Sequence, residues 1–165
     1  MAFSNLCNGI FEKSVIDYHV TDSVDASMNN PYELKSIEYC LYLKNWIDAV
    51  QWHFEDIIRD PQIDPVAALA LKRRIDKSNQ DRTDLVELID SYFLDKYKDV
   101  KLQADAIINT ESPAWAIDRL SILALKIYHM QQEVSRTDTT QEHKAQWQAK
   151  VNVILEQKED LSGAI

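Results

Sequence analysis

Turn-forming residues are scarce in this 165-residue chain, which contains only two glycines and four prolines. A fold of many strands needs tight turns, and glycine and proline supply most of them. Their scarcity disfavours a many-stranded sheet and favours a few long helices. Apolar runs are also short. Because none reaches the roughly 18 residues of a membrane-spanning helix, we expect no membrane insertion.

Basic residues are outnumbered, with 18 Lys and Arg against 27 Asp and Glu and a formal net charge of -9. This balance disfavours a general nucleic-acid surface, which needs a basic patch, but allows a few cationic groups to hold a small anion. Cys7 and Cys40 are far apart in the sequence, so we expect free thiols, which are typical of a reducing cytosol. The first 20 residues lack the pattern of a signal peptide, and we expect a cytoplasmic protein.

Hydrophobic residues make up 45% of the sequence and charged residues 27%, as in ordinary globular proteins. Apolar periodicity predicts helices over residues 2–20, 31–59, 65–97 and 113–133, followed by a fifth helix that ends near Lys158. Residues 98–112 are predicted to form a loop. The helix after Pro113 is apolar nearly all round, which indicates a central position. We predict one all-α domain over residues 1–165, a helical bundle of four or five helices.

The helix from Leu71 to Phe93 interrupts its own apolar stripe. Continuing the stripe through the middle of this helix leads to Asn79 and Arg82, where a bundle normally has leucine. Burying such groups costs several kcal/mol unless they are paired or contact a ligand. The sequence therefore predicts that Asn79 and Arg82 belong either to a site or to a polar network.

The second predicted helix has two different sides. Its apolar side, which we expect to face the core, contains Leu43, Ile47, Val50, Phe54 and Ile57. Its polar side, which we expect to face a cleft, contains Asn45, Asp48, Trp52, Glu55 and Arg59, with Asp56 at the edge.

Polar residues also share one side of the fourth predicted helix. Together with the two preceding helices, they suggest a pocket for a small anionic metabolite, phosphorylated or carboxylated. The residues that we expect to bind it are Arg82, Asn79, Arg119, Lys126, Asp118 and Trp52. Two alternatives remain open: a non-enzymatic structural or interaction protein whose polar residues form a buried ion network, and an arginine clamp of the chorismate-mutase kind. The sequence is also compatible with an oligomer.

Candidates for proton transfer are His129, Glu55 and Asp56, because a histidine needs a nearby acid to orient it. His19 and His143 have no informative context. The sequence contains no cofactor-binding motif, so it does not identify a cofactor. It also contains no His/Cys metal motif, and we predict no metal ligands. Acidic residues spaced three apart, at Asp84, Glu87 and Asp90, give a further alternative, an Mg²⁺-dependent enzyme similar to nucleotide pyrophosphatases.

Three segments together resemble a known family. They are NWIDAVQWHFED (45–56), KRRIDKSNQDRTDLVELID (72–90) and ESPAWAIDRLSILALKIYHM (111–130). The combination of NQ-x-R-x-D with IDRLSIL-x-LKIYHM resembles the bacterial domain-of-unknown-function family 4254, and the resemblance covers roughly residues 30–135. It implies a helical fold and no particular activity.

Overall fold

Five α-helices make up the computed structural model, which describes residues 2–165. They are α1 (Phe3–Thr21), α2 (Ile37–Ile58), α3 (Pro65–Lys96), α4 (Pro113–Ser135) and α5 (Gln141–Ala164). No strand occurs within residues 2–165, so the predicted all-α bundle is confirmed. None of the five helices is long and apolar enough to cross a bilayer.

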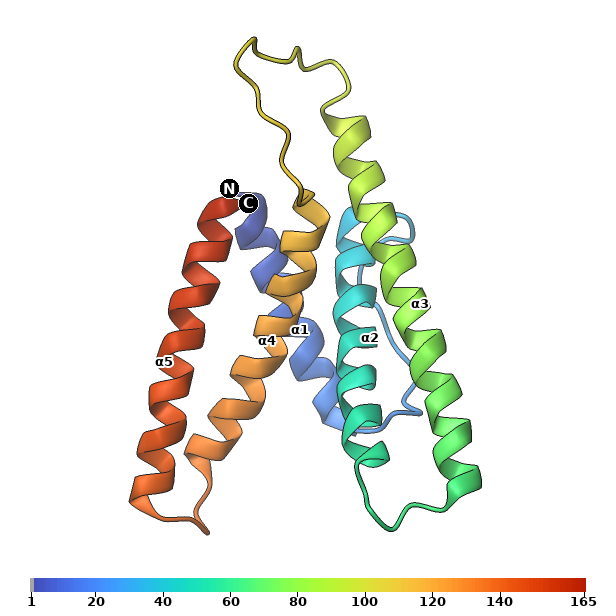
Figure 1. The fold of residues 1–165 in the computed structure, drawn as a ribbon, viewed down its shortest axis with the longest axis vertical. Helices are drawn as coiled ribbons and strands as arrows, with labels where there is room; N and C mark the ends of the chain where they lie inside the picture. The colour runs from blue at the N-terminus through green and yellow to red at the C-terminus, as the bar shows by residue number, and fades with distance from the viewer. Residues whose placement is uncertain (1) are drawn as a thin grey trace.

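The central position predicted for α4 is also confirmed, because α4 contacts each of the other four helices. Figure 1 shows α5 on one side of α4, α2 and α3 on the other, and α1 packed against α4 and α2. The loop between α3 and α4 extends beyond one end of the bundle (Figure 1).

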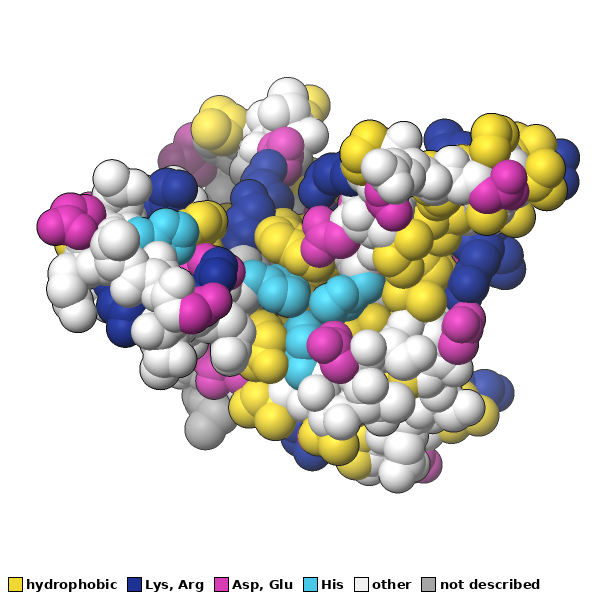
Figure 2. Space-filling model, turned by 90° about the horizontal axis from the view of Figure 1, so that it is seen from below, with side chains coloured by type: hydrophobic (Ala, Val, Ile, Leu, Met, Phe, Trp, Pro, Cys, Tyr) yellow, Lys and Arg dark blue, Asp and Glu magenta, His cyan; other side chains and the backbone are white. Residues whose placement is uncertain are grey.

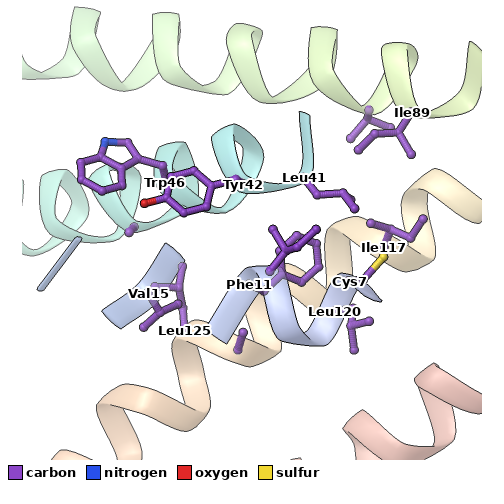
Figure 3. Close-up of a cluster of buried hydrophobic side chains, with 14 of the residues drawn as sticks. Cys7, Phe11, Val15, Leu41, Tyr42, Trp46, Ile89, Ile117, Leu120 and Leu125 are labelled. Atoms are coloured by element: carbon purple, nitrogen blue, oxygen red, sulfur yellow. The ribbon is translucent and has the colours of Figure 1, made fainter. Parts of the chain in front are cut away.

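The main core lies where α1, α2, α3 and α4 meet (Figure 3). Phe11 of α1, Leu41 of α2, and Ile117 and Leu120 of α4 are almost completely buried there. Ile89 of α3 closes the cluster from the side. Removing such side chains from water is the main force that holds the helices together.

Side-chain caps fix where four of the helices begin. Ser36, Asp64, Ser112 and Thr140 each accept a hydrogen bond from a backbone N–H in the first turn of the following helix. Pro65 and Pro113 occupy first-turn positions, where a missing N–H costs nothing.

The predicted start of α2 at residue 31 is wrong by six residues. Ser36 is the N-cap, and its hydroxyl accepts from Tyr39 N at 3.0 Å. Asn30, the residue before the predicted start, instead stabilises the turn that precedes α2: its Oδ1 accepts from Tyr32 N and its Nδ2 donates to the carbonyl of Tyr39. Lys35 has a φ of 75°, which is incompatible with a continuous helix through this segment.

Two details of the predicted faces also need correction. In α3 the buried polar residue is Ser78, whereas Asn79 is exposed, so the stripe passes through Ser78 and Arg82. In α2 the predicted apolar side is only partly buried, and Ile57 is 45% exposed. The buried residues of α2 include Asn45 and Asp48 from the side expected to be polar, together with Lys44. This side faces α4, where Asn45 and Asp48 bond to Ser121 and Lys44 pairs with Asp118.

Candidate functional site

A buried ion network joins α2, α3 and α4 at the centre of the bundle. The ammonium group of Lys44 contacts the carboxylates of both Asp48 and Asp118, and its Nζ lies 2.6 Å from Asp118 Oδ1. Arg82 Nε lies 2.6 Å from Asp48 Oδ1, and its NH2 group lies 3.4 Å from Asp118 Oδ1. The side chains of Lys44 and Asp48 are completely buried.

Hydrogen bonds complete this network. Ser121 Oγ donates to Asp48 Oδ2 at 2.6 Å, and Asn45 Nδ2 donates to Ser121 Oγ at 2.9 Å. Two cations and two carboxylates face one another, so the formal charges cancel. A charge-balanced, hydrogen-bonded group of this kind is how proteins tolerate buried ions, and it leaves no free cation for an anionic ligand.

This arrangement bears directly on Arg82, Asn79 and Asp118, three of the residues expected to bind a ligand. Arg82 and Asp118 belong to the ion network. Asn79 lies at its outer edge, where its Oδ1 accepts from Arg82 NH1 at 3.4 Å. The geometry thus favours the alternative of a structural network for these three residues.

A second polar group, the histidine cluster, consists of His19 on α1, His53 on α2 and His129 on α4. One ring nitrogen from each residue lies within 4.8 Å of the other two. His53 Nε2 and His19 Nε2 are 3.3 Å apart. Two nitrogens bound to a tetrahedral Zn²⁺ at about 2.0–2.1 Å are separated by roughly this same distance.

Neighbouring groups orient the three rings. His19 Nδ1 lies 2.6 Å from the carbonyl of Val15, which assigns its proton to Nδ1 and leaves the Nε2 lone pair facing His53 Nε2. The ring of His129 stacks on Trp52 with centroids 4.7 Å apart and planes inclined by 8°. The ring of His53 stacks on Tyr18 with centroids 5.2 Å apart.

His129 Nε2 is buried and has no hydrogen-bond partner, an unusual state for a polar atom inside a protein. Burial, with His19 and His53 as further causes, lowers the pKa of His129 to about 4. Burial also lowers the pKa of His19. Both rings are therefore neutral near pH 7, the form in which imidazole binds metals.

Solvent reaches the histidine cluster from one end of the bundle. In Figure 2 a group of histidine side chains lies in a hollow at this end, with acidic side chains beside it. One nearby carboxylate is Asp22, whose Oδ1 lies 3.4 Å from His53 Nε2. Three imidazoles in an open hollow leave room for a further ligand, as in catalytic rather than structural zinc sites.

A cleft of about 170 Å³, here called the α2 cleft, adjoins the cluster. Trp52 connects the two regions, because it lines the cleft and stacks on His129. The cleft is lined by Asp48, Gln51, Trp52, Glu55, Asp56, Arg59, Arg82 and Ile122. The expectation that the polar side of α2 faces a cleft therefore agrees with the structure, and Glu55 and Asp56 share this cleft with Arg82.

The other expected residues lie elsewhere. Arg119 and Lys126 line a groove of about 570 Å³ between α4 and α5, here called the α4–α5 groove. Asp84 and Glu87 are exposed on α3, and Asp90 accepts a hydrogen bond from Ser112 Oγ at 2.9 Å. Within residues 2–165 the only group of three potential metal ligands is the histidine cluster, so these three carboxylates do not converge on a common point.

Sequence reasoning missed three important residues, His19, His53 and Lys44. His19 lies in the last turn of α1, and no spacing connects it with ligands on two distant helices. Lys44 lies one turn before Asp48 on the same helix, a spacing that favours ion pairs and was a usable signal.

The fold and these two polar groups together define an all-α bundle with a closed ion network and an open histidine cluster. The sequence model of a family described as "Protein of unknown function (DUF4254)" matches residues 38–165. The match covers most of the chain, which belongs to this family. No curated protein and no solved structure gives a significant match.

Proposed function

We propose that the protein binds a divalent transition-metal ion, with Zn²⁺ as the best fit, through His19, His53 and His129. The observation that carries this proposal is the convergence of three imidazoles from three helices, with Nε2 of His129 buried and unpaired. Imidazole nitrogens suit Zn²⁺, Cu²⁺ and Ni²⁺, whereas Mg²⁺ and Ca²⁺ prefer oxygen ligands.

The orientation of the rings supports the same function. A metal-binding histidine usually donates its other ring N–H to a carbonyl or carboxylate, as His19 Nδ1 does to Val15. Because the cluster opens into a hollow, the bound ion would keep at least one position for water or a small ligand. We therefore propose that the bound ion can also bind a small molecule at this open position.

Calorimetric titration of the metal-free protein with ZnCl₂ tests this proposal. We expect one ion per chain and a higher melting temperature with Zn²⁺, but no comparable effect with MgCl₂. His129→Gln and His19→Gln should each weaken binding by roughly 100-fold or more, since even the loss of a group that only hydrogen-bonds to a metal ligand weakens binding by about 10- to 100-fold.

His143→Gln is the matched control, because His143 lies outside the cluster and contacts Glu133 at 3.1 Å. It should leave the affinity for Zn²⁺ unchanged. Equal binding by the His129→Gln variant, or equal loss in the control, would contradict the proposal.

A second candidate function is the binding of a small anionic metabolite, supported now by the α4–α5 groove rather than by Arg82. Lys126 lines this groove and has no ion-pair partner within residues 2–165. The volume of about 570 Å³ is typical of small-molecule sites.

NMR titration with octanoate tests this function, with 1-octanol as the neutral control. Saturable binding of octanoate should disappear in Lys126→Met; equal binding of both probes would contradict it.

We also propose a reducing cytoplasm as the cellular location, since Cys7 and Cys40 are free thiols. Recovery of the protein from an extracellular or periplasmic fraction would contradict this location.

A further inference from the structure

The α2 cleft has an apolar part and a polar part. Trp52 and Ile122 supply apolar surface, while Gln51, Glu55 and Asp56 supply hydrogen-bonding groups. At about 170 Å³ the cleft is smaller than the roughly 300–1,000 Å³ of drug-sized sites, so its ligand must be a molecule of a few carbon atoms.

Both arginines of the cleft already have carboxylate partners. Arg59 NH1 lies 3.1 Å from Asp56 Oδ1, and Arg82 pairs with Asp48 and Asp118. The only carboxylate of the lining without a cationic partner within residues 2–165 is Glu55. The lining therefore has three carboxylates against two guanidinium groups, an excess of one negative charge.

Gln51 adds a second, independent indication. Its Nε2 donates to Glu55 Oε1 at 3.2 Å, which fixes the orientation of the amide. Its Oε1 has no hydrogen-bond donor, although the residue is only 8% exposed. A buried acceptor without a donor is costly, and a ligand that donates hydrogen bonds would satisfy it.

We propose that the α2 cleft binds a small organic ammonium ion, whose N–H groups donate to Glu55 and Gln51 and whose alkyl part lies between Trp52 and Ile122. An ammonium group offers three donors and one positive charge, matching the unpaired acceptor and the excess carboxylate. Anionic ligands are disfavoured, because both arginines are occupied. This site goes beyond the proposed metal function and does not depend on it.

NMR of ¹⁵N-labelled protein, titrated with n-butylammonium, tests the site. Of the four tryptophans only Trp52 lines the cleft, and comparison with Trp52→Phe identifies its indole N–H signal. We expect a saturable shift of this signal with n-butylammonium and none with 1-butanol or butyrate. No saturable shift, or an equal shift with the neutral or anionic probe, would overturn the proposal.

The variant Glu55→Gln removes the excess charge while keeping the size of the side chain. It should weaken binding of n-butylammonium by about tenfold or more, because hydrogen bonds to charged groups are the strong ones. Glu38→Gln, in the first turn of the same helix, is the matched control and should leave binding unchanged. Unchanged binding in Glu55→Gln would overturn the proposal.

The two proposals can fail separately. Glu55→Gln, which removes the ammonium site, should still bind Zn²⁺. His19→Gln, which removes a metal ligand, should still bind n-butylammonium because His19 does not line the cleft. Loss of n-butylammonium binding in His19→Gln would mean that the ammonium site is not independent of the histidine cluster, which overturns it as stated.

Discussion

The ion network and the histidine cluster differ in how far their polar groups are paired. Arg82 and His53 make the comparison direct, because both side chains are 23% exposed. Arg82 contacts two carboxylates and closes a balanced set of four charges. His53 contacts another imidazole at 3.3 Å in a cluster where His129 Nε2 has no partner. Asn45 Oδ1, beside the ion network, also lacks a donor. The difference is therefore that the charged groups of the network pair with one another, whereas the unpaired atom of the histidine cluster belongs to one of three converging imidazoles.

The largest effect that tests this contrast is expected at Lys44. Lys44→Met leaves the carboxylates of Asp48 and Asp118 with a single cation, so the free energy of unfolding should fall by about 3–5 kcal/mol. Urea unfolding with matched m-values measures the change.

Lys72→Met is the control for this experiment. Lys72 also pairs with an aspartate one turn away on its helix, Asp76, but both side chains are more than half exposed. Its removal should change stability by about 0.5 kcal/mol or less. A similarly small loss for Lys44→Met would show that the network is not structurally important.

A smaller loss is expected for Arg82→Leu. This variant also leaves two carboxylates with a single cation, but Arg82 lies at the edge of the network with 23% of its side chain exposed, so water can partly replace it. Leucine at this position also continues the apolar stripe of Ile75 and Val86. We expect a decrease of about 2–3 kcal/mol in the free energy of unfolding, measured in the same way. An increase in stability would mean that Arg82 is strained in the absence of a ligand, and the anion-binding interpretation of Arg82 would then be restored.

The smallest effect is expected for His53→Gln. The carboxylate that loses a contact, Asp22, is 58% exposed and stays solvated, so the metal-free protein should change by about 1 kcal/mol or less in its free energy of unfolding. The rise in melting temperature caused by ZnCl₂ should nevertheless be lost, since a ligand of the metal is gone. If the free energy of unfolding fell as much as in Lys44→Met and the response to ZnCl₂ were unchanged, the histidine cluster would be a structural network and not a metal site.

The helices were predictable because their signals are local. Pro65 and Pro113 mark first turns, and apolar residues at helical spacing indicate where the helices lie, although not always which face is buried. The start of α2 was not predictable in the same way. Asn30 and Ser36 are both good caps, and what separates them is the bond from Asn30 to the carbonyl of Tyr39, which exists only in the folded turn.

The candidate site was only partly predictable, since its residues are brought together by packing between distant helices. Arg82 was identified because it interrupts an apolar stripe, a feature visible within one helix. Asp118 was expected in the same pocket and Asp48 on the polar side of α2, but their ion pairs with Arg82 were not predictable, because the carboxylates approach it only when α2 and α4 pack together. His19 and His129 are 110 positions apart, and no periodicity relates them.

One consequence follows from the low burial of α5. Val151 and Ile154 are its only buried residues, and although it packs along α4, it otherwise contacts only α1. Fixing each residue of a helix costs about 1–2 kcal/mol of backbone entropy, and two buried side chains offset little of it. Local opening of α5 should therefore precede that of α2, so its amide hydrogens should exchange faster with deuterium. Because α5 forms one wall of the α4–α5 groove, a ligand bound there would slow this exchange, and deuterium uptake along α5 would report its occupancy.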